Sequence, residues 1–228
     1  MNTIHFIDNI HFDYGRLLSN APSKLKAGEV FVRQGDLDGA CAVYSLMMML
    51  IINKKVTKGD LVKRDKNAGY TAKKRLQDKF LSGIIGLYRG GYYFDALAED
   101  LKESFAKVAT ASTYCVGYPD RDDVVLKDEL HNKIMETIDA GKPVEIGFAF
   151  KGGNGGHAVV AIGYCQYKSR IQLFCLDPAY NLPQTSLWNT IIEIETKSDK
   201  RKTYTDTCFT PEDQSVNSID VDEILIMD

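Results

Sequence analysis

The chain has 228 residues, of which 44% are hydrophobic and 26% are charged, the balance of an ordinary globular protein with a full core. Its formal net charge of −3 gives no overall electrostatic reason to bind nucleic acid or an anionic membrane. The longest apolar run, ACAVYSLMMMLII, is too short to cross a bilayer. The first residues have neither the basic nor the apolar region of a secretory signal. We therefore expect a cytoplasmic protein, with secretion as an effector as the alternative.

After a short β-like beginning, the N-terminal half is predicted to be helical. Residues 3–12 and 29–34 are β-like runs on either side of a loop-like segment. The run at 39–53 is apolar nearly all round and predicts a buried helix. Residues 57–67 open with Thr57 and place Asp60 three residues later, a start similar to a capping box. Two further stretches have apolar residues at helical spacing, at 70–86 and 93–108.

The C-terminal half is predicted to be mainly strands. A strand at 108–118 and an amphipathic helix at 123–141 come first. Strands are then predicted at 143–150, 157–166, 170–178, 187–195, 202–210 and 222–227. This order predicts a single α+β domain over residues 1–228, with a helical lobe at about 30–106 and an antiparallel sheet lobe at about 107–228.

The stretch QGDLDGAC, residues 34–41, places a cysteine between a polar turn and the buried helix. In the first turn of that helix, the helix dipole and the free N–H groups favour the thiolate form of Cys41. Gln34 is a neutral carboxamide donor that a turn could fold back toward Cys41. Together with the Cys41 backbone N–H, it would supply two donors for an oxyanion. The alternative is that Cys41 is a small core residue.

A nucleophilic cysteine needs a base, and the chain has four histidines: His5, His11, His131 and His157. His131 lies in a helical stretch rich in Lys and Glu, where we expect it to be solvated. His5 and His11 flank a strand-like run that has no partner motif. His157 follows GGNGG and begins a strand, and such a junction can hold an imidazole at the edge of a cleft. We therefore predict that His157 is the base.

The strand that begins at His157 is followed by a short turn near Lys168 and a strand that ends at Asp177. Antiparallel pairing outward from this turn places His157 within a couple of residues of Asp177. A carboxylate in that position can orient an imidazole and stabilise its protonated form. A register slip of one residue would send Asp177 to the opposite face. Asn189 is the weaker candidate for the same role, so we expect Asn189→Ala to have little effect.

The order of these motifs resembles that of the papain-like cysteine peptidases. GAC at 39–41 is similar to the core of the papain signature, and KPVEIGFAF, GGHAVVAIGY and FCLDP resemble the sheet lobe of the bacterial C39-like branch. The resemblance implies a papain-like α+β fold with the active-site cleft between a helical lobe and an antiparallel sheet lobe. It also implies that Cys41 is the nucleophile, His157 the base, Asp177 its orienting group and Gln34 the oxyanion donor.

This resemblance predicts a thiol hydrolase that cleaves a peptide or isopeptide bond of a peptide or protein substrate. One alternative keeps the same triad for acyl transfer, as in a transglutaminase, or for glutamine deamidation. A second is an inactive binding module of the same fold. Residues 54–80 could serve such a module, because they carry ten Lys or Arg against three Asp, net +7. A solvated helical face is the simpler interpretation of that stretch.

Five cysteines at scattered spacings, with no CxxC pair, fit reduced thiols better than a disulfide framework. We expect buried thiols in the strand-like runs, at Cys115, Cys165, Cys175 and Cys208. No set of His, Cys and carboxylates has the spacing of metal ligands, so we expect neither a metal nor a cofactor, and no nucleic-acid partner. The glycines of KGGNGG are interpreted as a turn or as a flap beside His157.

Overall fold

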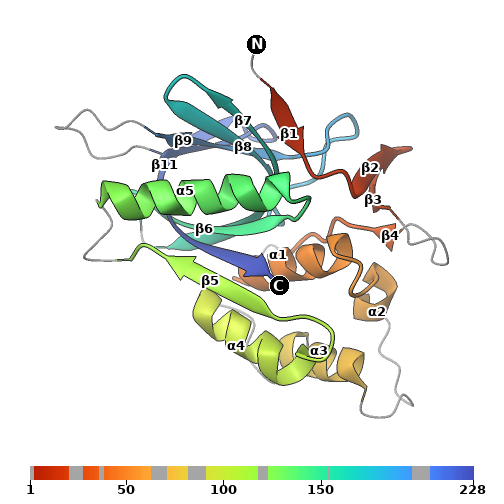
Figure 1. Cartoon of the computed structure of the whole chain (residues 1–228). Coiled ribbons are helices and arrows are strands. Elements are labelled where there is room, and N and C mark those ends of the chain that lie inside the picture. The colour runs from red at the N-terminus through yellow and green to blue at the C-terminus, as the bar shows by residue number, and fades with distance from the viewer. Residues whose placement is uncertain are drawn as a thin grey trace.

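The structure is a computed structural model that describes residues 3–20, 28–35, 39–62, 71–81, 91–117, 123–153, 155–196 and 206–228. It is an α+β fold in which antiparallel strands form a large sheet and α1 to α4 gather along one side of it (Figure 1). A further helix, α5, lies against β1, β6, β7 and β11. No helix in the described ranges is long and apolar enough to cross a membrane.

The helices follow the sequence pattern closely. Their bounds are Cys41–Ile52 (α1), Lys58–Val62 (α2), Ala72–Phe80 (α3), Phe94–Phe105 (α4) and Val124–Asp139 (α5). Helix α1 lies along β6 and β7 and is buried on nearly every side, which explains why its sequence has no polar face. The capping interaction of α2 is confirmed, because the Thr57 N–H and Oγ both donate to the Asp60 carboxylate at 2.8 Å. The predicted continuations of the second and third helices, at 63–67 and 82–86, lie outside the described residues.

One eight-stranded sheet contains most of the strands. Its members are Ile4–Phe6 (β1), Ala111–Cys115 (β5), Val144–Phe150 (β6), Gly156–Tyr167 (β7), Arg170–Leu176 (β8), Thr190–Glu195 (β9), Asp206–Thr210 (β10) and Ser215–Met227 (β11). The pairing order is β1-β7-β6-β11-β10-β9-β8, and β5 pairs with β11. Because β7 also pairs with β8, the order closes on itself. Ile10–Asp13 (β2), Arg16–Ser19 (β3) and Gly28–Glu29 (β4) form a separate small sheet.

Two burial expectations were wrong. His131 is only 3% exposed because it lies on the stripe of α5 that includes Lys127, Leu130, Ile134 and Ile138, all of them buried. Burial, followed by the positive charge of Lys127, lowers the pKa of His131 to about 4. Cys115 is exposed, whereas the other three strand cysteines are buried as expected.

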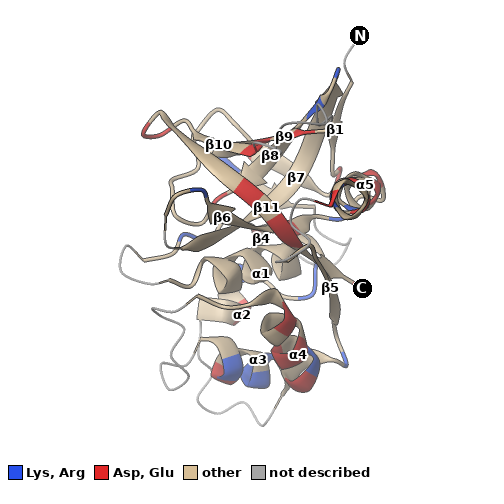
Figure 2. Ribbon diagram, turned by 90° about the vertical axis from the view of Figure 1, so that its left-hand side faces the viewer, with Lys and Arg blue, Asp and Glu red and all other residues tan. Residues whose placement is uncertain are grey.

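The basic stretch at 54–80 pairs mainly with acidic side chains nearby. Lys73 binds Asp60, Lys74 binds Asp78 and Lys79 binds Asp100, with N–O distances of 2.8, 2.7 and 2.7 Å. Figure 2 shows these charges interleaved on α3 and α4. Three lysines of the described part of the stretch therefore have acidic partners, which favours the interpretation of a solvated helical face.

Candidate active site

Cys41 is the first residue of α1. No side chain among the described residues caps this end of the helix, and the first turn contains no acidic residue. Burial by itself raises the pKa of the Cys41 thiol. The hydrogen bond and the charge of His157 outweigh that effect, together with the backbone N–H groups of Ala158 and Ala42, so that the pKa is lowered overall. The surroundings of Cys41 therefore favour a thiolate, the reactive form of cysteine.

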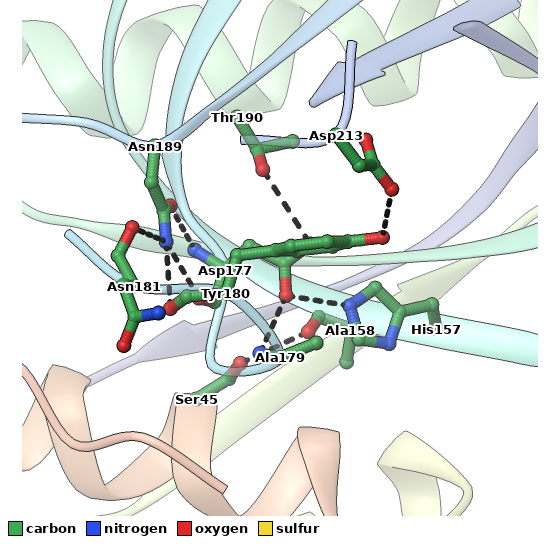
Figure 3. Close-up of polar contacts among 10 residues, drawn as sticks. All are labelled: Ser45, His157, Ala158, Asp177, Ala179, Tyr180, Asn181, Asn189, Thr190 and Asp213. Carbon is green, nitrogen blue, oxygen red and sulfur yellow. Dashed lines mark hydrogen bonds and ion pairs between the residues drawn. The ribbon is translucent and has the colours of Figure 1, made fainter. Parts of the chain in front are cut away.

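His157 lies near the start of β7, and its imidazole ring has Cys41 and Asp177 as its two side-chain partners. The Nε2 atom of His157 is 2.8 Å from Oδ1 of Asp177 (Figure 3), which leaves Nδ1 for Cys41. The two side chains are 14% and 2% exposed. Burial by itself lowers the pKa of His157, but the charge and hydrogen bond of Asp177, and then Cys41, raise it to about 10. The raised pKa of His157 favours an imidazolium at neutral pH, and the lowered pKa of Cys41 favours a thiolate beside it.

A β-bulge in β7 places the side chain of Asp177 on the same face of the sheet as that of His157. Near the turn, Tyr167 pairs with Arg170, but the register shifts by one residue between Ala161 and Gly163. Beyond the shift, Val160 pairs with Leu176, and the next step places Asp177 opposite Val159. Val159 and His157 are two residues apart and share a face. Without the bulge, Asp177 would lie opposite Val160 and point away from His157.

Asn189 holds the backbone at Asp177 and does not itself contact His157 through any hydrogen bond recorded in the described structure. Its Oδ1 accepts the Asp177 N–H at 2.7 Å, and its Nδ2 donates to the Asp177 carbonyl at 2.8 Å and to the Tyr180 carbonyl at 3.2 Å. The Ala179 N–H adds a bond of 2.8 Å to Asp177 Oδ1. Asn189 is 1% exposed. Asn189 therefore holds the turn that carries the Asp177 carboxylate. For this reason we now expect Asn189→Ala to destabilise the turn, and no longer to have little effect.

Ser45 ties α1 to the strand that carries His157. It lies one helical turn after Cys41 and therefore on the same face of α1. Its hydroxyl donates to the carbonyl of Ala158 at 3.2 Å, while the Ala158 N–H binds the Cys41 thiol. Both backbone groups of Ala158 thus hold the helix against the sheet. Sequence analysis missed Ser45, although its spacing of four residues from Cys41 was a usable signal.

The structure brings Gln34 close to the turn after Asp177. The Gln34 N–H donates to the carbonyl of Pro178 at 2.9 Å, and the Gln34 Oε1 atom is buried with no hydrogen-bond partner in the described structure. No contact between its carboxamide and Cys41 is recorded. Residues 36–38, which lead from this segment to α1, lie outside the described residues.

A cavity of about 270 Å³ opens beside Cys41 and His157. Its walls are Cys41, Ala42, Gly91, Tyr92, Tyr93, Phe94, Phe148, Gly155, Gly156, His157, Ala158 and Glu223. Two of the glycines of the KGGNGG stretch therefore border the cavity. Four of the wall residues are Phe or Tyr, and Glu223 is the one carboxylate among the wall residues. Sequence analysis gave Glu223 no role.

A second acidic residue, Glu145 on β6, is completely buried. Neither of its carboxylate oxygens has a hydrogen-bond partner among the described residues. Burial raises the pKa of Glu145 well above its usual value, and the charges of Cys41 and Glu223 add to that effect. Burial and these two negative charges therefore favour the protonated form of Glu145.

The sequence model of the Peptidase C39-like family matches residues 30–207, a range that includes Gln34, Cys41, His157 and Asp177. This range is well over half of the chain, and the protein belongs to the Peptidase C39-like family. The predicted resemblance to the C39-like branch of the papain-like cysteine peptidases is thereby confirmed, and it supports cysteine peptidase activity in general terms. A comparison with curated proteins finds no significant match.

Proposed function

We propose that the protein is a cysteine peptidase of papain-like architecture that hydrolyses a peptide or isopeptide bond in a peptide or protein substrate. The observation that carries this proposal is the chain of contacts from Cys41 through His157 to Asp177. The lowered pKa of the thiol and the raised pKa of the imidazole fit a thiolate–imidazolium pair.

In the proposed mechanism, the Cys41 thiolate attacks the carbonyl carbon of the scissile bond. The Cys41 backbone N–H and the Gln34 carboxamide donate hydrogen bonds to the oxyanion that forms. His157 then gives its Nδ1 proton to the leaving amine, and the collapse of the intermediate leaves an acyl group on the sulfur. His157 next removes a proton from water, which attacks the acyl group and releases the acid.

Asp177 keeps the ring of His157 in one orientation through both half-reactions. Its carboxylate is fixed in turn by Ala179 and by the hold of Asn189 on the turn. The tie between the Gln34 N–H and Pro178 supports a position for Gln34 beside the same turn. The proposed site thus consists of a nucleophile, a base, an orienting carboxylate and two oxyanion donors, and the proposed steps use no cofactor.

Reaction with iodoacetamide followed by mass spectrometry tests this proposal. Cys41 should be alkylated faster than the four other cysteines at pH 6, although Cys115 is the more exposed thiol. Cys41→Ala should abolish hydrolysis of a peptide library, whereas Cys115→Ala, the matched control, should retain it. Preferential labelling of Cys115 at pH 6, or full hydrolysis by Cys41→Ala, would contradict the proposal. Adding a primary amine to the assay separates hydrolysis from acyl transfer by the mass of the product.

A further inference from the structure

The cavity beside Cys41 contains a carboxylate for which the described structure provides no cationic partner. Glu223, on β11, is half-buried and lines the cavity together with Cys41 and His157. The N–H of Phe94, at the start of α4, binds the Glu223 carboxylate. No Lys or Arg of the described residues forms an ion pair with it. Such a carboxylate is available to a cation that enters the cavity.

The position of Glu223 depends on a glycine in the neighbouring strand. Glu223 pairs with Gly147 on β6, and Gly147 pairs with Ala158 on β7. A Cβ atom built on Gly147 would lie 2.4 Å from Cγ of Glu223, so any larger residue would push this side chain away. Since the N–H of Ala158 binds the Cys41 thiol, the row Ala158–Gly147–Glu223 connects the nucleophile with the carboxylate across three strands.

Two carboxylates near this row, Asp222 and Asp95, act on Glu223 through their negative charge. Figure 2 shows acidic residues on β11 and on α4. These two elements contact each other, and each contributes a residue to the cavity wall, Glu223 and Phe94. The titratable groups near Glu223 are Asp222 on its own strand, Cys115 on β5, Glu145 on β6, Asp95 on α4, the Cys41–His157 pair and the wall residues Tyr92 and Tyr93. The imidazolium of His157 is matched by the thiolate of Cys41 and by Asp177. The field inside the cavity therefore attracts a cation.

The other walls suit the apolar stem of a basic side chain. Phe94, Phe148 and Tyr92 contribute aromatic surface to the cavity, against which methylene groups can pack and which attracts a cation at its faces. A volume of about 270 Å³ has room for one side chain of a substrate and not for an element of a folded partner. A lysine or arginine side chain has both parts, an apolar stem and a positive end.

We propose that Glu223 and the aromatic walls of the cavity form a subsite for a lysine or arginine side chain of the substrate, next to the scissile bond. This inference rests on the proposed peptidase function and adds a substrate class to it. Glu223 is a specificity-determining residue in this proposal and takes no part in the bond-breaking steps.

The test uses the full-length protein and electrophilic peptide probes that alkylate Cys41. Lysine is placed in turn at each of the three residues before the electrophile, and each probe is compared with the same peptide carrying norleucine, which has the four-carbon stem of lysine without the ammonium group. At one position, the wild-type protein should react roughly 10–100-fold faster with lysine, the range for a hydrogen bond to a charged group. Glu223→Gln should remove most of this preference while it keeps an acceptor for the Phe94 N–H.

Asp95→Asn is the matched control, because Asp95 adds negative charge near Glu223 without lining the cavity. It should retain the lysine preference. Equal loss in both variants would mean that a general field and not a subsite selects lysine, and would overturn the proposal. Circular dichroism should show both variants to be folded.

The pH dependence provides a second readout. Burial, followed by the charge of Asp222, raises the pKa of Glu223 to about 7, so the carboxylate gains charge between pH 6 and pH 8. The ratio of lysine to norleucine rates should therefore rise over this interval, by up to roughly ninefold. Ionisation of Cys41 affects both probes equally and cancels in the ratio. In Glu223→Gln the ratio should stay constant.

Iodoacetamide, which needs no subsite, separates this inference from the proposed function. If iodoacetamide labels Cys41 rapidly at pH 6 but no position prefers lysine, the subsite does not exist and the nucleophile remains. If iodoacetamide fails to label Cys41 preferentially, the proposed function itself fails. A lysine preference that persists in Glu223→Gln would also refute the role of Glu223.

Discussion

Asp177→Asn tests the electrostatic origin of the reactive thiol. The substitution removes a negative charge that lies 2.8 Å from His157 Nε2 and keeps an oxygen that can accept the Ala179 N–H. His157 then keeps the burial that lowers its pKa and loses the largest effect that raises it. We expect the imidazole to become neutral near pH 6.5 and Cys41 to revert to a thiol.

The expected magnitude follows from the thiolate fraction. The wild-type thiol, with its lowered pKa, should be more ionised at pH 6.5 than a thiol with the ordinary pKa of about 8.5, which is roughly 1% ionised there. The rate of iodoacetamide labelling at Cys41 should therefore fall by up to roughly 100-fold. A thiol of higher pKa is intrinsically more nucleophilic, which reduces that factor. Turnover should fall by roughly 10²–10⁴, the usual range for loss of acid–base catalysis.

The assay measures the labelling rate at Cys41 by mass spectrometry from pH 5 to pH 9, with circular dichroism to verify folding. Asp213→Asn is the control, because Asp213 is an aspartate on the same side of the site that contacts Tyr180 at 3.2 Å and not His157. It should keep the wild-type profile. If Asp177→Asn is folded and labels within a few-fold of wild type at pH 6.5, Asp177 does not support the ion pair and the proposed triad is wrong.

Three further predictions concern neighbouring residues. Gln34→Ala should reduce turnover by roughly 10²–10³ and leave Cys41 labelling largely intact; equal loss of both would make Gln34 a structural residue. Asn189→Ala leaves the buried backbone groups of Asp177 without partners at about 1–3 kcal/mol each, so urea unfolding should show a loss of about 3 kcal/mol or more, and a loss below 1 kcal/mol would contradict this hold on the turn. The raised pKa of Glu145 means that the folded state binds a proton more tightly than the unfolded state. The free energy of unfolding should therefore fall as the pH rises above about 4.3, the pKa of an unfolded-state Glu, by up to about 1.4 kcal/mol per pH unit. Glu145→Leu should remove that slope and raise stability at pH 7; an unchanged slope would show that Glu145 titrates normally.

The sequence determined the identity and the local setting of the candidate residues. The apolar run from Cys41 onward required a buried helix, and a helix that starts at a cysteine exposes its first N–H groups to the sulfur whatever lies around it. Alternating and apolar runs after residue 143 likewise required strands. The short turn at Lys168 and Ser169 brought His157 and Asp177 to the same end of two strands, because pairing outward from a turn is fixed by counting.

The tertiary structure decided which face each side chain occupies. Asp177 reaches His157 because a bulge between Ala161 and Gly163 shifts the register by one residue. A glycine inside a strand is a signal for a bulge, but only the pairing of β7 with β8 decides that the register shifts there. His131 is buried because α5 turns that side of the helix inward. Surface charges on a helix do not show which stripe will meet the sheet.

The cavity and its carboxylate depend on the tertiary structure still more. Glu223, Gly147 and Ala158 are separated by up to 76 positions in the sequence, and only the pairing of β11, β6 and β7 sets them in one row. A glycine in a strand and an acidic residue near the end of the chain look unremarkable when they are read separately. Local propensity fixes what each segment becomes, whereas long-range strand register fixes which side chains share one space, and that register results from packing over the whole sheet.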